Sequence, residues 1–141
     1  MMKNHPLPQQ IEARMTKVAA FLSAHPQLEF AYLFGGLARE RHTPLSDVDI
    51  AIYLAEASDR TQVKLDLLGG LMKILGTDEV DLVVLNDAPL SLRGRIVSSR
   101  KVLVDKNPFL RHGFESLTLR EFFDFSYKEK EILERRYLRG R

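Results

Sequence analysis

The sequence predicts an α/β (α+β) fold in which a mixed sheet of about four strands is flanked by helices. Short apolar runs of strand length alternate along the chain with longer stretches of helical periodicity. The chain has 141 residues with 45% hydrophobic content, which is typical of one soluble globular domain with a buried core. We therefore expect a single domain over residues 1–141, with residues 109–141 as a carboxyl-terminal helical extension.

The first elements are recognised by apolar spacing and by the residues that end them. In the expected helices apolar residues recur at three- and four-residue steps, and the first helix ends before Pro26. Pro44 ends a short helical segment that follows a Gly-Gly turn. Ser58 or Asp59 is suited to cap the next long helix, and Gly76 to stop it. The first five expected elements are a helix over residues 8–24, a strand over 29–34, the short helical segment, a strand over 47–54 and a helix over 58–75.

The remaining elements continue the alternation of strands and helices. Residues 80–85 are apolar and β-branched, as expected of a buried strand. Pro89 suits the first turn of a helix, whereas Pro108 and Gly113 are taken to separate the last strand from a long terminal helix. The later elements are a strand over residues 80–85, a helix over 89–99, a strand over 101–105 and a helix over 115–138.

The terminal helix has apolar residues on two sides, which is more than one small core easily covers. Packing inside the fold or in a homodimer, and docking on a different protein, are both consistent with this pattern. If docking applies, the second row is the docking row, flanked by Arg120, Lys128 and Lys130. The two rows are Phe122, Phe125, Ile132 and Leu133 on one side, and Leu119, Phe123 and Tyr127 on the other.

A Gly-Gly turn followed by two spaced carboxylates is the most informative motif. Gly35 and Gly36 end an apolar strand, and ten residues later Asp47 and Asp49 open the next one. Alternate residues of a strand share a face, so these two carboxylates have α-carbons about 6.5 Å apart on one side of the sheet. The backbone N–H groups at the glycines are suited to hold phosphates, because glycine lets the main chain approach a ligand closely.

Two like charges held this close favour a cation between them. Mg²⁺ binds carboxylates, waters and phosphate oxygens. Asp81 starts the next strand, and if the two strands pair, three carboxylates converge on two ions about 3.5 to 4 Å apart. The alternatives are a plain turn at the glycines, strand-edge charges that prevent aggregation at Asp47 and Asp49, and a capping role for Asp81.

These motifs resemble the nucleotidyltransferase signature of the DNA polymerase β superfamily, in which Gly-Ser, ten residues and Asp-x-Asp precede a third aspartate. Residues 33–39 (LFGGLAR) and 46–50 (SDVDI) resemble more narrowly the minimal nucleotidyltransferase (MNT) proteins, the antitoxin partners of HEPN-domain toxins. The resemblance covers most of residues 28–105. One position departs, because Gly36 replaces the family serine and lacks its hydroxyl donor.

The resemblance implies a nucleotidyltransferase domain that transfers AMP from ATP to a tyrosine hydroxyl of a cognate HEPN ribonuclease toxin and silences it. Two Mg²⁺ ions are implied, with Asp81 next to the incoming hydroxyl. Arg39 matches the family arginine and is expected to bind phosphate. The rivals are a binding antitoxin that no longer turns over, and an enzyme that modifies a small molecule, against which the missing second domain argues.

Composition excludes several other classes. With no cysteine, the chain has no disulfide framework and no thiolate-bound zinc, which is compatible with the cytoplasm. The four histidines share no metal-ligand spacing. The apolar runs are too short to span a membrane, and the first residues lack the apolar core of a signal peptide. We therefore expect a cytoplasmic protein without a membrane role.

Charge is unevenly distributed. Residues 1–92 hold 8 Lys/Arg and 12 Asp/Glu, a net charge of −4, whereas residues 93–141 hold 13 and 7, a net charge of +6. The basic half is consistent with a solvated helical face, an acidic protein partner or nucleic acid. Aromatic and basic residues are not interleaved as in a nucleic-acid module, so we do not expect direct DNA or RNA binding.

Overall fold

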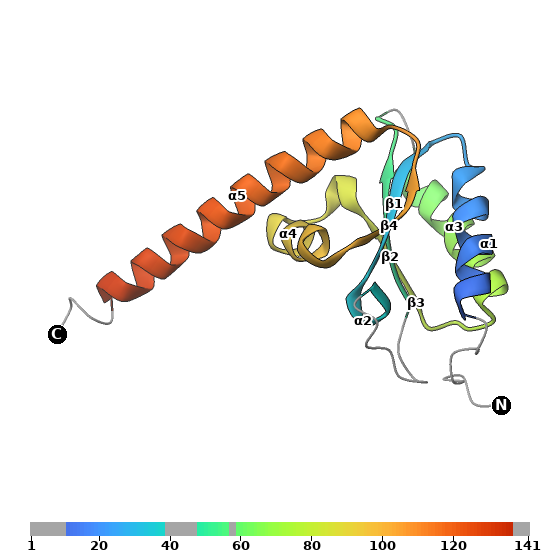
Figure 1. The fold of residues 1–141 in the computed structure, drawn as a ribbon, viewed down its shortest axis with the longest axis horizontal. Helices are drawn as coiled ribbons and strands as arrows, with labels where there is room; N and C mark the ends of the chain where they lie inside the picture. Colours follow the sequence, from blue (N-terminus) through green and yellow to red (C-terminus); the bar gives the residue numbers. More distant parts are fainter. Residues whose placement is uncertain (1–10, 39–47, 57–58, 137–141) are drawn as a thin grey trace.

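The computed structural model describes residues 11–38, 48–56 and 59–136 (Figure 1). The predicted order of strands and helices is confirmed within these ranges. Four predictions lie outside these ranges: the roles of Pro44 and Ser58, the start of the first helix at residue 8 and the end of the last helix at residue 138. No helix in the described ranges is both long and apolar enough to cross a bilayer. The elements are α1 (Ile11–Ser23), β1 (Leu28–Phe34), α2 (Gly35–Ala38), β2 (Val48–Leu54), α3 (Arg60–Leu75), β3 (Val80–Val84), the 3-10 helix η1 (Leu85–Asp87), α4 (Leu90–Ser99), β4 (Lys101–Asp105) and α5 (Pro108–Glu134).

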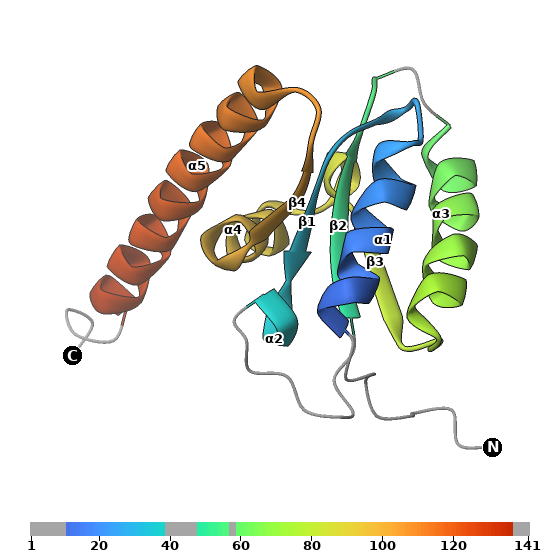
Figure 2. The same cartoon turned by 45° about the vertical axis from the view of Figure 1, so that its right-hand side comes forward.

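The strands form one four-stranded sheet in the order β3-β2-β1-β4. β1 is antiparallel to both β2 and β4, whereas β2 and β3 are parallel, so the sheet is mixed as expected. Helices cover both faces: α1 and α3 lie on one side, and α4 and α5 on the other (Figures 1 and 2). This arrangement gives the sheet two apolar layers.

The first layer packs the sheet against α1 and α3. Every fourth residue of α3 is buried from Val63 to Leu75, so the helix presents one apolar stripe to the sheet. The side chain of Asp59 caps this helix by accepting a hydrogen bond from the backbone N–H of Gln62. Gly76 ends it in the left-handed conformation, at φ 70°.

The second layer is aromatic and packs the sheet against α4 and α5. The rings of Phe30 and Tyr53 stack with centroids 4.8 Å apart, and Phe114 of α5 meets Tyr53 edge-on at 5.2 Å. α4 approaches α5 closely at Gly94, where an added Cβ would lie 2.2 Å from the ring of Phe122. A side chain at Gly94 would therefore push the two helices apart.

α5 begins at Pro108, so the predicted start at Glu115 is wrong. Asn107 caps the helix by accepting a hydrogen bond from the backbone N–H of Leu110 at 3.1 Å. Pro108 occupies the first turn, where its missing N–H leaves no helical hydrogen bond unmade. Gly113 lies inside the helix, because an exposed glycine only weakens a helix and does not end it.

A buried carboxylate joins α5 to the sheet. Glu115 is only 8% exposed and accepts a hydrogen bond from the hydroxyl of Tyr32 on β1 at 2.6 Å. The guanidinium of Arg100 donates to both oxygens of Glu115, at 3.0 and 3.1 Å. Arg111 donates to Glu115 at 3.0 Å and to Asp105 at 2.9 Å. These charge-assisted bonds tie the first turns of α5 to β1 and to both ends of β4.

The network keeps Glu115 ionised and Tyr32 protonated. Burial by itself raises the pKa of Glu115, but hydrogen bonds from Tyr32 and the two arginines outweigh it and hold the pKa below its usual value. Burial, followed by the bond to Glu115, raises the pKa of Tyr32 well above its usual range. Because the folded-state pKa of Glu115 is lowered, its contribution to stability is present above the ordinary value of 4.5 and is lost as pH falls through the lowered pKa.

Tyr32→Phe tests this network by removing the donating hydroxyl and keeping the ring. We expect the free energy of unfolding at pH 7 to fall by about 1.5–3 kcal/mol, the scale of a hydrogen bond to a charged group. Tyr53→Phe is the matched control, because the Tyr53 ring packs in the same layer and its hydroxyl makes no hydrogen bond to the described residues. Urea unfolding followed by circular dichroism measures both variants, and an equal loss in the two would contradict the role of Glu115.

Candidate functional site

Two of the three predicted carboxylates are neighbours across a strand pair. β2 and β3 pair in parallel with Asp49 opposite Asp81. Neighbouring strands lie about 4.8 Å apart, so the two side chains leave the sheet close together. Val48 and Ile50 belong to the layer under α1 and α3, so Asp49 between them points to the face that carries α4 and α5. Asp49 is partly buried, and Asp81 is exposed.

Gly35 lies directly against the Asp49 carboxylate. It has a φ of +73°, a conformation that favours glycine. A Cβ built on Gly35 would lie 2.2 Å from Oδ2 of Asp49, far inside van der Waals contact. The backbone at the start of α2 therefore reaches the carboxylate only because no side chain intervenes. Glycine is required here for both its conformation and its size.

Gly36 differs from Gly35 in backbone conformation. It lies in the single turn of α2, and among the described glycines the positive φ values belong to Gly35 and Gly76. A serine at Gly36 is therefore compatible with the local backbone. The predicted phosphate ligand Arg39 and the predicted metal ligand Asp47 lie outside the described residues. Placement of Asp47 on the face of Asp49 stays a prediction from strand alternation.

The described carboxylates are hard oxygen donors. Asp49 and Asp81 offer oxygens of the kind that Mg²⁺ prefers, rather than the imidazole and thiolate ligands typical of zinc. Within residues 11–38, 48–56 and 59–136, no group of three or more His, Cys, Asp or Glu side chains is placed to hold a metal ion. The donor chemistry of the described pair is therefore compatible with Mg²⁺.

The larger of two cavities does not lie at the carboxylates. A cavity of about 720 Å³ lies at the opposite end of β2, beside Tyr53, Asn86 and Phe114. A smaller one of about 360 Å³ is lined by Asp81 and borders α3 and α4. We take the carboxylates as the candidate site, because Asp49 and Asp81 lie in register on neighbouring strands and Asp49 lies against the backbone of Gly35. Residues 39–47, which follow α2 and precede β2, are outside the described ranges.

Basic side chains beside Asp81 were not anticipated from the sequence. Arg60 and Lys64 of α3 line the smaller cavity together with Asp81. Arg60 donates to Asp87 at 2.6 Å, so part of its charge is already paired. Residues four apart share one face of a helix, which was the available signal. The sequence did not show that this face meets the edge of β3.

The family model of polymerase beta nucleotidyltransferases matches residues 16–109. This range includes every strand of the sheet, the turn at Gly35 and both described carboxylates. The chain therefore belongs to the polymerase beta nucleotidyltransferase family. The predicted fold is confirmed by this match.

Solved toxin–antitoxin complexes contain chains similar to this one. A toxin–antitoxin complex with AMP-PNP matches at 25% identity and a TM-score of 0.68, over 87% of this chain and 95% of that chain. The toxin–antitoxin complex MntA-HepT matches at 26% identity and a TM-score of 0.65, over 87% and 96%. A tri-AMPylated Shewanella oneidensis HEPN toxin in complex with MNT antitoxin matches at 24% identity and a TM-score of 0.67, over 87% and 95%, and supports the fold alone. No curated protein matches the chain.

Gly35→Ala is expected to disturb the site and the fold together. The left-handed conformation costs a residue with a Cβ about 1–2 kcal/mol, and the added methyl group must also displace the Asp49 carboxylate. We therefore expect a clear drop in melting temperature. The matched control is Gly69→Ala, since Gly69 lies in α3 with no atom within 4 Å of an added Cβ. Melting temperatures are measured by calorimetry. An equal melting temperature for the two variants would contradict the close contact between Gly35 and Asp49.

Proposed function

We propose that this chain transfers AMP from ATP to a tyrosine hydroxyl of a cognate HEPN-domain toxin and thereby neutralises the toxin. Membership of the polymerase beta nucleotidyltransferase family supports nucleotidyl transfer. The similar complexes support the partner and the nucleotide, since both are toxin–antitoxin pairs and one holds AMP-PNP. The observation that carries the proposal is the register of Asp49 with Asp81, beside the backbone of Gly35.

In this proposal Asp47, Asp49 and Asp81 would hold the metal, and the register of Asp49 with Asp81 supports a shared role for these two. Mg²⁺, when bound by carboxylates and phosphates, supplies charge neutralisation for in-line displacement at phosphorus. The backbone N–H groups of Gly35 and Gly36 would donate hydrogen bonds to the phosphates. The carboxylate of Asp49 lies beside Gly35, next to this phosphate position. Asp81 is the most exposed described carboxylate of the site, which suits it to meet a hydroxyl from another protein.

The reaction is a single substitution at the α-phosphorus of ATP. Asp81 accepts the proton of the tyrosine hydroxyl as the oxygen of that hydroxyl bonds to the α-phosphorus. The bond between the α-phosphorus and the oxygen bridging to the β-phosphorus breaks, and pyrophosphate leaves with that electron pair. Positioning of the two substrates provides much of the acceleration.

Gly36 supports a second function, a binding antitoxin that does not turn over. The family serine would donate a hydroxyl hydrogen bond to the nucleotide, and glycine has none. The backbone donors remain, so ATP binding does not depend on that hydroxyl alone. The two functions differ in a single observable, which is whether the partner gains the mass of an adenylyl group.

Asp49→Asn is expected to abolish transfer while leaving the fold intact, and Asp47→Asn should do the same. The amide removes the negative charge that the metal needs, and relief of like-charge repulsion can raise the melting temperature. Asp66→Asn is the control, because Asp66 is exposed on α3 and bonds to Gln62 at 2.8 Å. The purified chain, ATP, Mg²⁺ and the HEPN protein are incubated and read by intact mass. Transfer at the wild-type rate by Asp49→Asn would exclude the carboxylate site.

Gly36→Ser restores the hydroxyl that the family has. If only a donor is missing, the variant should bind ATP more tightly by up to about 1.5 kcal/mol, the net scale of one hydrogen bond, or transfer AMP faster. Gly113→Ser is a suitable control, since Gly113 lies in α5 with no atom within 4 Å of an added Cβ. Calorimetric titration with ATP decides the question. Equal or weaker binding by Gly36→Ser would reject the missing donor.

A further inference from the structure

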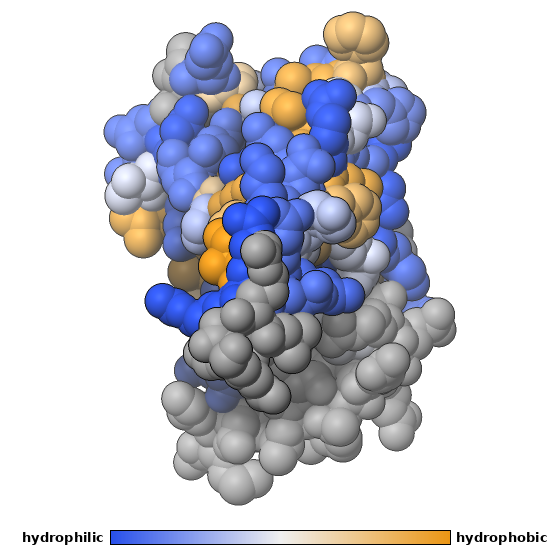
Figure 3. All heavy atoms as spheres, turned by 90° about the vertical axis from the view of Figure 1, so that its left-hand side faces the viewer, coloured by the Kyte–Doolittle hydropathy of each residue, from blue (hydrophilic) through white to orange (hydrophobic). Residues whose placement is uncertain are grey.

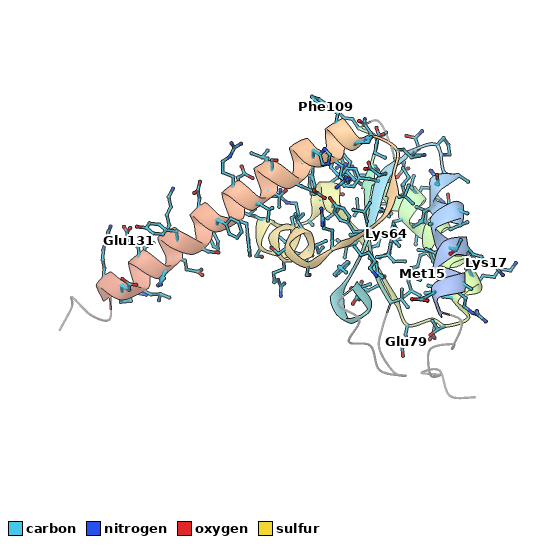
Figure 4. The ribbon with its side chains drawn as sticks, viewed as in Figure 1. Met15, Lys17, Lys64, Glu79, Phe109 and Glu131 are labelled. Carbon is cyan, nitrogen blue, oxygen red and sulfur yellow. The ribbon has the colours of Figure 1, made fainter. Side chains whose placement is uncertain are left out.

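α5 divides into an anchored half and a free half. In the anchored half Glu115 and Thr118 are 8% and 1% exposed, and Phe122 lies against Gly94 of α4. Beyond Phe122 the helix runs clear of the sheet, as the position of Glu131 shows (Figure 4). We call residues 123–134 the α5 overhang. Its large apolar side chains are exposed: Phe123 at 59%, Phe125 at 49%, Tyr127 at 69%, Ile132 at 58% and Leu133 at 47%.

The overhang has the composition of a surface that is covered in a complex. Aromatic residues are enriched at the centres of protein interfaces, where they bury large areas at a small loss of side-chain freedom. Single exposed apolar residues are ordinary, but here five of them lie within one short helical segment.

A second copy of this chain is a poor partner for the overhang. Leu119 packs against the aromatic core layer and Phe122 packs on α4, so they define the inward stripe of α5. One heptad further on, this stripe continues with Ser126 and Glu129. A coiled coil of two α5 helices needs apolar residues at these positions. Ser126 and Glu129 therefore interrupt a dimer seam, and the stripe is apolar again only at Leu133.

Four of the five exposed apolar side chains instead occupy two flanks of the helix, and Leu133 lies on the inward stripe one heptad after Ser126. Phe123 and Tyr127 lie one turn apart on one side, whereas Phe125 and Ile132 lie two turns apart on the other. The view toward the end of α5 shows apolar side chains on either side of hydrophilic ones (Figure 3). A helix with two apolar flanks fits between two walls of a groove better than against a flat surface.

We propose that the α5 overhang docks into an apolar groove of the HEPN-domain toxin, with Phe123 and Phe125 as opposed anchors. The identity of the partner rests on the proposed function, and the similar complexes of known structure are toxin–antitoxin pairs. In two views the overhang descends to the level of α2, the helix that begins at Gly35 (Figures 1 and 2). A toxin that extends from the overhang toward α2 would bring its tyrosine to the carboxylate end of the sheet.

Apolar burial rather than charge carries this contact. Pro108–Glu134 contains 4 Lys/Arg and 6 Asp/Glu, so the +6 balance of residues 93–141 does not lie on α5. Arg120, Lys128 and Lys130 alternate with acidic residues and do not form the basic flank expected from the sequence. Leu119, expected in the docking row, packs against the core instead. Affinity for the toxin should therefore change little with salt.

The test titrates the full chain with its purified HEPN protein by calorimetry. Phe123→Asp and Phe125→Asp should each weaken binding by about 30-fold or more, as expected for buried aromatic anchors. Leu117→Asp is the matched control, because Leu117 is 47% exposed but lies in the anchored half of α5. It should bind within about twofold of wild type. Tyr127→Ser, at a residue 69% exposed, serves as the milder variant if an aspartate unfolds the chain.

The outcomes separate docking from catalysis. Folded Phe123 and Phe125 variants that bind the toxin with wild-type affinity overturn the proposal. So does a wild-type dimer, seen by light scattering, that these substitutions dissociate while toxin binding persists. A chain that needs the overhang for binding but never transfers AMP would refute the proposed function and leave docking intact. ATP affinity, measured on the free chain, should be unchanged in every overhang variant.

Discussion

The register of β2 between β1 and β3 is the constraint on which the rest of the structure depends. Val48 and Ile50 lie in the apolar layer under α1 and α3, which leaves Asp49 on the opposite face. A slip of one residue would bury the carboxylate in that layer and expose the apolar row. Packing of an uncharged core therefore decides where two negative charges meet.

A buried network of ion pairs fixes the position of α5 on the sheet. Glu115 accepts hydrogen bonds from Tyr32 of β1, from Arg100 just before β4 and from Arg111 of α5, and these bonds fix the direction in which the helix leaves the sheet. Gly94 then lets Phe122 rest on α4. Anchoring stops there, and the rest of the helix is presented to solvent. Replacing one partner of such a network is more damaging than replacing all of it, because a buried charge is left unpaired.

Local signals in the sequence determined most elements and part of the site. The apolar run to Phe34, the glycines after it and the alternation from Val48 predicted a strand, a turn and a second strand. Asp59 and Gly76 predicted the ends of α3 correctly. These signals are readable because capping, turn conformation and strand alternation act between residues a few positions apart. The spacing of the Gly-Gly turn and the two aspartates also predicted the family.

Only the tertiary structure decided what depends on residues distant in the chain. The sequence placed Asp81 near Asp49 only if two strands paired, and the parallel register supplied that condition. Nothing local marked Gly35 as the residue that touches Asp49, or Glu115 as buried. The start of α5 was misplaced because Pro108 and Gly113 look like breaks, whereas the Asn107 cap and packing on the sheet extend the helix through both. Long-range packing outweighs local propensity at these positions, since each contact there joins segments whose proximity no short sequence window contains.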